Sequence, residues 1–168
     1  MARSPRWEPE FCEFFAGRQR PFMRTAYAML GSWPAAEDAT QHTFTALYAH
    51  WPRIQPERLE AYARRTLVNA CISTYRTRGR EILTDQPPEP NRGAGTECDE
   101  TRVVLIGVLN GLPVRDRAVL ALRFLDDLPV AEVAEILEVP EGTVKSQTSR
   151  ALSRLHLAMT EPVKGHLE

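Results

Sequence analysis

Apolar residues recur at three- and four-residue intervals along most of the chain, and this spacing predicts a series of amphipathic helices. In the N-terminal half, the predicted helices span 8–30, 34–50 and 56–78. In the C-terminal half, they span 104–109, 117–124 and two short segments between Leu128 and Leu155. No alternating run is long enough to predict a strand, so we expect an all-α fold.

The ends of these helices coincide with residues that stop or start helices. Gly31-Ser32 ends the first helix, and Ser32 or Trp33 then precedes a proline and an acidic pair, which is a plausible start for the second. Trp51-Pro52 ends the second helix, and Gly111-Leu112-Pro113 ends the fourth.

The last two predicted helices are joined by a tight turn. Each has an apolar stripe, made of Val130, Val133, Ala134 and Leu137 in the first and of Val144, Ala151, Leu152 and Leu155 in the second. The opposite face of the second helix carries Lys145, Ser146, Ser149, Arg150 and Ser153. This pattern suits a helix seated on a small core with its polar face in the DNA major groove. On spacing alone, an αα-hairpin with a solvated polar face fits equally well.

The turn between these two helices departs from the usual pattern. Helix-turn-helix turns usually carry glycine where this chain has Glu138. A residue other than glycine in a left-handed conformation costs roughly 1 kcal/mol. Pro140 and Glu141 follow and suit the first turn of the next helix, where a missing N–H costs nothing and a negative charge meets the positive end of the dipole.

A Pro/Gly-rich stretch at 87–96, PPEPNRGAGT, interrupts the helical pattern near the middle of the chain. It has the composition of an extended, flexible linker. We therefore predict two small helical domains, at 8–80 and 102–160, joined by a flexible acidic linker over 81–101.

The formal net charge of −1 predicts neither nucleic-acid nor membrane binding, but the charges are unevenly distributed. Residues 53–80 hold seven arginines against two glutamates, and residues 142–160 hold three basic residues and no acid. Between them, residues 81–100 hold six acids: Glu81, Asp85, Glu89, Glu97, Asp99 and Glu100. Two basic segments thus flank an acidic one.

The third predicted helix mixes arginines with Tyr62, Tyr75 and Asn69. Arginine contacts phosphate, aromatic rings stack on bases, and asparagine hydrogen-bonds a base edge, so the helix is a candidate nucleic-acid surface. The alternative is a solvated, arginine-rich helix whose tyrosines belong to the core.

Other function classes find little support. The three cysteines, Cys12, Cys71 and Cys98, are far apart and form no zinc or disulfide pattern, which fits reduced thiols in the cytoplasm. Part of a metal site could be formed by Glu37, Asp38 and His42, but no second cluster supplies the remaining ligands. We therefore expect no enzyme activity, metal or cofactor. Since there is no run of ~18 apolar residues and no apolar signal core, we expect no membrane span and no signal peptide.

Three stretches resemble the extracytoplasmic-function (ECF) sigma factors of bacterial RNA polymerase, a group of the sigma-70 family. AAEDATQHTF at 35–44 is similar to the family's region 2.2, and AYARRTLVNACISTYRTRGR at 61–80 to regions 2.3 and 2.4. The stretch from 109 to 152, ending in GTVKSQTSRAL, resembles region 4 nearly throughout. The wording KSQTSRAL specifically resembles an actinobacterial, SigE-like subgroup.

The resemblance implies a role for each of three residue sets. One set would bind the coiled-coil of the largest subunit of core RNA polymerase: Glu37, Asp38 and Gln41. The second would engage the −10 promoter element, with the loop Pro52–Glu57 helping to capture a flipped base: Arg53, Arg64, Arg65, Asn69 and Arg76. The third would read the −35 element in duplex DNA, with Arg154 on a phosphate: Lys145, Ser146, Gln147, Ser149, Arg150 and Arg154.

Gln147 departs from the family, which often has arginine at this position. Glutamine prefers an adenine edge and arginine a guanine edge, so the −35 preference of this chain is expected to differ accordingly. The resemblance also implies that the acidic linker runs along the polymerase cleft, and that an anti-sigma factor is a further candidate partner. The main alternative is a helix-turn-helix regulator that binds palindromic duplex DNA as a dimer without polymerase. That alternative leaves the N-terminal half unexplained.

Overall fold

The computed structural model describes residues 3–81 and 107–160 of the chain, and the described residues are helical or in short turns. The all-α prediction is confirmed. The N-terminal half contains α1 (Glu8–Leu30), α2 (Trp33–His50), the 3-10 turns η1 (Trp51–Arg53) and η2 (Pro56–Arg58), and α3 (Leu59–Glu81). After residues 107–110, which are helical, the C-terminal half contains α5 (Val114–Leu120), the π-helical turn η3 (Ala121–Leu125), α6 (Val130–Leu137) and α7 (Glu141–Thr160).

The helix ends lie close to the predicted breakers. Gly31 caps the end of α1 in a left-handed conformation (φ 66°), and its N–H donates to the Tyr27 carbonyl. Ser32 is the N-cap of α2, where its Oγ accepts from the Ala35 N–H at 3.5 Å. The third α-helix begins at Leu59 rather than 56, because the residues from Pro56 to Arg58 form a 3-10 turn.

The turn between α6 and α7 has the geometry expected of its sequence position. Glu138 adopts a left-handed conformation (φ 55°, ψ 44°), as the alignment with glycine in such turns predicts. Its N–H donates to the Glu135 carbonyl at 3.3 Å, and the Val139 N–H donates to the Ala134 carbonyl at 3.1 Å. These bonds satisfy the last carbonyls of α6 and fix the direction in which α7 leaves the turn.

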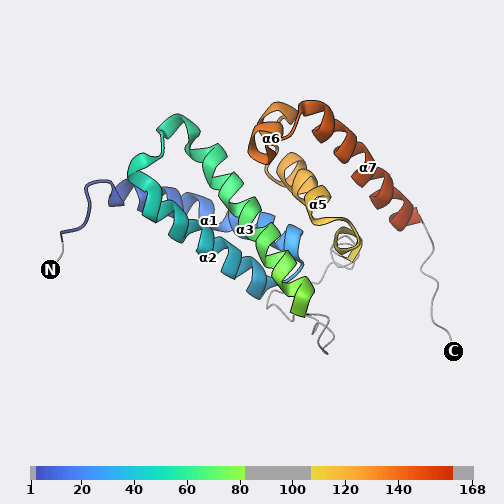
Figure 1. Cartoon of the computed structure of the whole chain (residues 1–168), viewed down its shortest axis with the longest axis horizontal. Helices are drawn as coiled ribbons and strands as arrows, with labels where there is room; N and C mark the ends of the chain where they lie inside the picture. The colour runs from blue at the N-terminus through green and yellow to red at the C-terminus, as the bar shows by residue number, and fades with distance from the viewer. Residues whose placement is uncertain (1–2, 82–106, 161–168) are drawn as a thin grey trace.

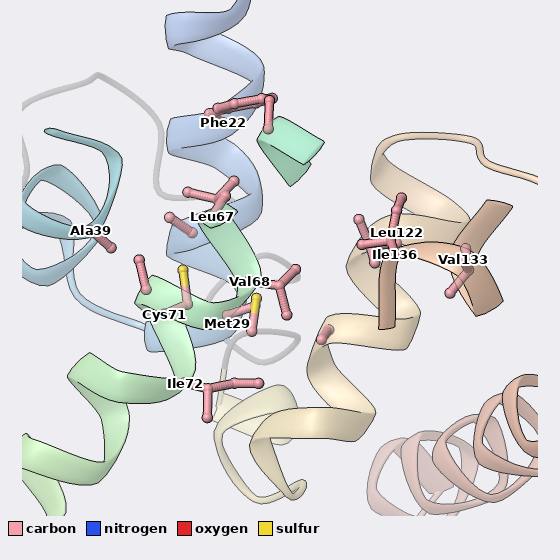
Figure 2. Close-up of a cluster of buried hydrophobic side chains, with 14 of the residues drawn as sticks. Phe22, Met29, Ala39, Leu67, Val68, Cys71, Ile72, Leu122, Val133 and Ile136 are labelled. Atoms are coloured by element: carbon pink, nitrogen blue, oxygen red, sulfur yellow. The ribbon is translucent and has the colours of Figure 1, made fainter. Parts of the chain in front are cut away.

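The two halves of the chain pack against each other and share one hydrophobic core. In Figure 1, α3 lies beside α5 and α6, while α7 lies on the outer side of α5. Figure 2 shows Leu122 and Ile136 of the C-terminal half on the side nearer to Val68 of the N-terminal half, and Met29 and Val133 belong to the same buried cluster. All five side chains are almost completely buried. The sequence predicted two separate domains and did not predict this interface.

Polar contacts reinforce the interface between the halves. Arg117 of α5, which is 3% exposed, donates from Nη1 to the Met29 carbonyl at the end of α1 at 2.7 Å. Its other donors bond the carbonyls of Asn110 at 2.9 Å and Leu112 at 3.0 Å, and its guanidinium lies 5.0 Å from the centre of the Tyr75 ring on α3. One buried arginine thus joins elements from both halves of the chain.

Candidate DNA- and polymerase-binding surfaces

The helix predicted to read duplex DNA, α7, presents its polar face to solvent. Val144 and Ala151 are fully buried and hold the helix on the core. Gln147 is half-buried, and the other side chains predicted to contact the −35 element are exposed: Lys145, Ser146, Ser149, Arg150 and Arg154. Nothing among the described residues covers this face, so the helix is accessible for insertion into the major groove of DNA.

Two side chains of this face make contacts within the chain itself. Ser146 Oγ donates to the Thr143 carbonyl at 3.1 Å. Arg154 Nη1 lies 4.0 Å from Oδ2 of Asp116, whose side chain is almost buried. The Arg154 side chain is itself 54% exposed, so its guanidinium is still accessible to a phosphate.

The five side chains predicted to bind the −10 element fall into two groups. Arg64 and Arg65 on α3 are partly covered by the C-terminal half, with 15% and 34% of their side chains exposed. The other three are exposed: Arg53, Asn69 and Arg76. The structure thus brings only part of the predicted set to the surface.

Arg64 belongs to a chain of ion pairs that crosses between the halves. Its Nη1 donates to Glu60 Oε2 at 2.7 Å, and its Nε donates to Asp126 Oδ2 at 3.3 Å. Glu60 also pairs with Arg18 of α1, and Asp126 Oδ1 accepts from Thr25 Oγ1 of α1 at 3.1 Å. The pairing with Glu60 raises the pKa of Arg18. Asp126, just after the π-helical turn η3, therefore contacts α1 and α3 at the same time.

Arg65 caps the end of α6. Its Nη2 donates to the Glu135 carbonyl at 2.7 Å, and its Nε to the Ile136 carbonyl at 3.3 Å. Its Nη1 also lies 3.2 Å from a carboxylate oxygen of Glu138. A guanidinium is favoured at a helix C-terminus because the last carbonyls carry partial negative charge.

An open groove of about 350 Å³ lies where α3 meets α5. Two predicted −10 residues, Asn69 and Arg76, line it together with Arg115, which was not among the predicted DNA-binding residues. The remaining lining residues are Ile72, Ser73 and Thr77. The groove is polar and carries two guanidinium groups, a combination that suits a nucleic-acid strand.

The three residues predicted to bind polymerase lie together on the exposed face of α2. Glu37, Asp38 and Gln41 are all exposed, and Gln41 Nε2 lies 3.5 Å from Glu37 Oε1. The opposite face of the helix, which includes Ala39 and Leu47, is buried in the core. The patch is therefore rigidly backed and free to contact another protein helix.

The remaining chemistry of the described residues is sparse. Within residues 3–81 and 107–160, no group of three His, Cys, Asp or Glu could hold a metal ion, and His42 is simply exposed beside Gln41. Burial raises the pKa of the Cys71 thiol to about 12, so this thiol stays protonated and unreactive. Cys12, in contrast, is exposed to solvent. Cys98 and residues 82–101 of the linker predicted over 81–101 lie outside the described residues, whereas Glu81 is the last residue of α3. In the described part of the chain, every helix is too short or too polar to span a lipid bilayer.

Two protein-family models match separate parts of the chain. Residues 14–81 match the family description "Sigma-70 region 2", and residues 102–155 match "Sigma-70, region 4". The region 2 match accounts for the N-terminal half, which a stand-alone helix-turn-helix regulator leaves unexplained.

Individual relatives agree with the family match. The chain is 34% identical to an RNA polymerase sigma-E factor of Streptomyces coelicolor over 87% of this chain and 84% of the relative, and 33% identical to that of Streptomyces avermitilis over 87% and 83%. Among solved structures, the fold is similar to the sigma factor RpoE of Bartonella quintana, in complex with the anti-sigma factor NepR, with a TM-score of 0.71 and 22% identity. That likeness covers 90% of this chain and 98% of the other, so it extends over both halves. In sigma-70 family proteins, regions 2 and 4 recognise the −10 and −35 promoter elements. The chain belongs to this family and is an RNA polymerase sigma factor of its ECF group.

Proposed function

We propose that this chain directs transcription initiation through three separate surfaces, one on each of α2, α3 and α7. The observation that carries the proposal is the seating of α7. Its apolar residues Val144 and Ala151 are buried, while its basic and polar side chains stand exposed on the opposite face. This arrangement suits insertion of the helix into a major groove.

On α7, Lys145, Ser149 and Arg150 would contact base edges and phosphates of the −35 element in duplex form. Gln147 would hydrogen-bond an adenine, since its amide matches the N6 and N7 positions of that base. Arg154, at 54% side-chain exposure, would add a phosphate contact that positions the helix without reading sequence.

On α3, Asn69 and Arg76 would meet the −10 element first, because both are exposed along the groove beside α5. Asn69 would read a base edge, and Arg76 would hold a phosphate. Arg53, in the exposed turn before α3, would help the loop Pro52–Glu57 to capture a base that leaves the duplex. Flipping a base costs a few kcal/mol of unstacking, which contacts in the protein offset. Binding energy alone thus separates the strands, without covalent chemistry.

On α2, Glu37, Asp38 and Gln41 would bind the coiled-coil of the largest subunit of core RNA polymerase. Their exposure on one face of a rigid helix supports this role. An acidic and amide patch of this kind is complementary to a basic partner helix. Because the polymerase is a cytoplasmic enzyme in bacteria, the chain would act in the cytoplasm.

An anti-sigma factor is a further proposed partner. Two similar structures are the sigma factor RpoE in complex with the anti-sigma factor NepR, and CnrH in complex with the cytosolic domain of CnrY. The acidic linker is proposed to run along the polymerase cleft, where its six carboxylates would resemble the charge of nucleic acid.

Run-off transcription with purified core polymerase on sheared host genomic DNA tests the proposal. We expect discrete start sites that depend on the added chain, and alignment of those sites would yield both promoter elements. Asp38→Ala with Gln41→Ala should reduce co-elution with core polymerase and leave binding to −35 duplex DNA intact. Glu13→Ala, an exposed acid on α1, is the matched control. If no chain-dependent transcripts form and the chain does not co-elute with core polymerase, the proposal is wrong.

A further inference from the structure

We propose that the groove between α3 and α5 is a binding site for a nucleoside polyphosphate, with adenine as the favoured base. The groove has a volume of about 350 Å³, which lies within the range of ~300–1,000 Å³ typical of small-ligand sites. Six side chains line it: Asn69, Ile72, Ser73, Arg76, Thr77 and Arg115. Their chemistry changes from one end of the groove to the other, and this gradient identifies the class of ligand.

Five of the six lining residues form one face of α3. Positions 69, 72, 73, 76 and 77 follow the three- and four-residue spacing of a single helix face. At 1.5 Å per residue, the eight steps from Asn69 to Thr77 extend ~12 Å along the helix axis. Sites for single-stranded nucleic acid hold ~4–16 nucleotides, so a strand would continue past the ends of this groove. Its length and volume suit a single nucleotide.

The phosphate-binding end of the groove is formed by Arg76 of α3 and Arg115 of α5. Both side chains are exposed, and neither forms an ion pair with another residue of 3–81 or 107–160. The exposed Ser73 adds a hydroxyl donor. A guanidinium group binds phosphate oxygens through parallel N–H donors. Two such groups, one on each wall of the groove, suit a ligand that carries two or more phosphates.

The charge of the groove also favours an anion. Among the described residues that line it, none is acidic. Asp116 follows Arg115 in the chain, but its Oδ2 lies 4.0 Å from Nη1 of Arg154 on α7. In Figure 1, α7 lies on the opposite side of α5 from α3, so this carboxylate faces away from the groove. The two positive charges of the groove therefore attract a ligand of opposite sign.

The other end of the groove has the chemistry to hold a nucleobase. Ile72, which is 9% exposed, provides an apolar floor. Asn69 lies about one turn earlier on α3 and is exposed. Its amide can bond both N6 and N7 of adenine. An inorganic polyphosphate would leave these two side chains without contacts, so the gradient from amide and apolar groups to guanidinium groups favours a nucleotide.

Isothermal titration calorimetry on the full chain, without polymerase or DNA, tests the site. The probes are ADP, adenosine and inorganic pyrophosphate. Arg115→Gln is the diagnostic variant, because Arg115 belongs to none of the proposed DNA- or polymerase-binding surfaces. Arg78→Gln is the matched control, because Arg78 is an exposed arginine of α3 that does not line the groove. Far-UV circular dichroism confirms that each variant keeps its helices.

We expect ADP to bind at one site per chain. Adenosine and pyrophosphate each lack part of the contacts and should bind at least about tenfold more weakly. Arg115→Gln should raise the Kd for ADP about tenfold to a hundredfold, which is the range expected for losing one charged donor group. Arg78→Gln should keep the Kd within about twofold, because an exposed charge outside the site contributes little. In NMR spectra of the isotope-labelled chain, ADP should shift the side-chain amide signals of Asn69.

The nucleotide site shares Asn69 and Arg76 with the proposed −10 surface but does not rest on that role. If both proposals hold, ADP at ten times its Kd should raise the apparent Kd for the −10 single strand about elevenfold, by simple competition. If ADP binds as expected and does not compete, the −10 assignment fails and the nucleotide site stands.

Three results would overturn the inference. The first is the absence of saturable ADP binding up to about 1 mM. The second is pyrophosphate binding as tight as that of ADP, since the base would then contribute nothing. The third is an equal loss of ADP affinity from Arg115→Gln and Arg78→Gln, because such a loss would report the overall charge of the chain and not a site in the groove.

Discussion

Replacing Arg117 should destabilise the packed arrangement of the two halves strongly for a single residue. Its three donors bond the carbonyls of Met29, Asn110 and Leu112, and its guanidinium packs on the Tyr75 ring. Burial lowers the pKa of Arg117, and this is the expected consequence of removing a charged group from water. Arg117→Met keeps most of the side-chain volume and removes every donor, so its effect reports the hydrogen bonds rather than a cavity.

The magnitude follows from the number of bonds and the burial. A hydrogen bond to a charged group contributes ~1.5–3 kcal/mol, so three bonds give a gross loss of about 4.5–9 kcal/mol. Removal of the buried charge recovers part of its desolvation cost, which leaves a net loss of about 2–4 kcal/mol. In a chain of this length, 1 kcal/mol shifts the Tm by ~2–4 °C, so we expect a decrease of roughly 5–15 °C.

The assay is thermal and urea unfolding followed by far-UV circular dichroism. Arg115→Met is the matched control, because Arg115 lies two residues earlier on the same helix and is exposed. It should change the free energy of unfolding by less than about 0.5 kcal/mol. If Arg117→Met is no more destabilising than Arg115→Met, the hydrogen bonds of Arg117, one of which crosses to Met29 in the N-terminal half, do not stabilise the fold and the reasoning fails.

Three further predictions follow from single positions. Glu138→Gly should raise the free energy of unfolding by up to about 1 kcal/mol, because glycine adopts φ 55° without strain and the exposed pair with Arg65 contributes little; a decrease in urea unfolding would contradict this. In a Cys12→Ser, Cys98→Ser background, Cys71 should not react with a thiol reagent at pH 8 until the chain unfolds, since its pKa of about 12 keeps it protonated; rapid labelling of the native chain would refute its burial. Gln147→Arg should shift the preferred −35 base from adenine towards guanine in a selection from randomised duplexes, and an unchanged consensus would remove Gln147 from the reading surface.

The helices could be predicted from the sequence because their signals are local. Apolar spacing and breakers placed α1 and α2 within one residue of their observed bounds. They also located α6 and α7 in the stretch from Leu128 to Leu155, although α7 is longer than predicted and continues to Thr160. The left-handed conformation of Glu138 was also predictable, since the turn position alone requires it. Local signals missed the π-helical turn η3, in which the Asp126 N–H bonds the Ala121 carbonyl at 3.1 Å, because no residue type marks such a turn.

The interface between the halves could not be predicted, since its contacts join residues far apart in sequence. Arg117 lies 88 residues from Met29, and Arg65 lies 70 residues from Glu135. Sequence spacing carries no information about such pairs. One local signal was present: Arg117 falls within the apolar stripe of its predicted helix, where a charged residue requires a buried partner. The sequence placed Arg64 and Arg65 on α3, because helix spacing is local. It did not indicate that both have intramolecular partners, because those partners lie far away along the chain.

The length of the linker decides whether regions 2 and 4 can occupy both promoter elements at once. The −35 and −10 elements lie about 25 base pairs apart, which is roughly 85 Å along B-DNA at 3.4 Å per base pair. The predicted linker over 81–101 has 21 residues, so it reaches at most about 70 Å when extended, and the folded halves span the rest of that distance. Deleting 87–96 leaves 11 residues and a reach of about 37 Å. We expect this deletion to leave −10 strand and −35 duplex binding intact when each is measured alone, and to abolish most run-off transcription. Replacing the same ten residues with a Gly/Ser segment of equal length should restore transcription, because such a segment is flexible and equally long. Full transcription from the deleted chain would mean that regions 2 and 4 reach both promoter elements without this length of linker.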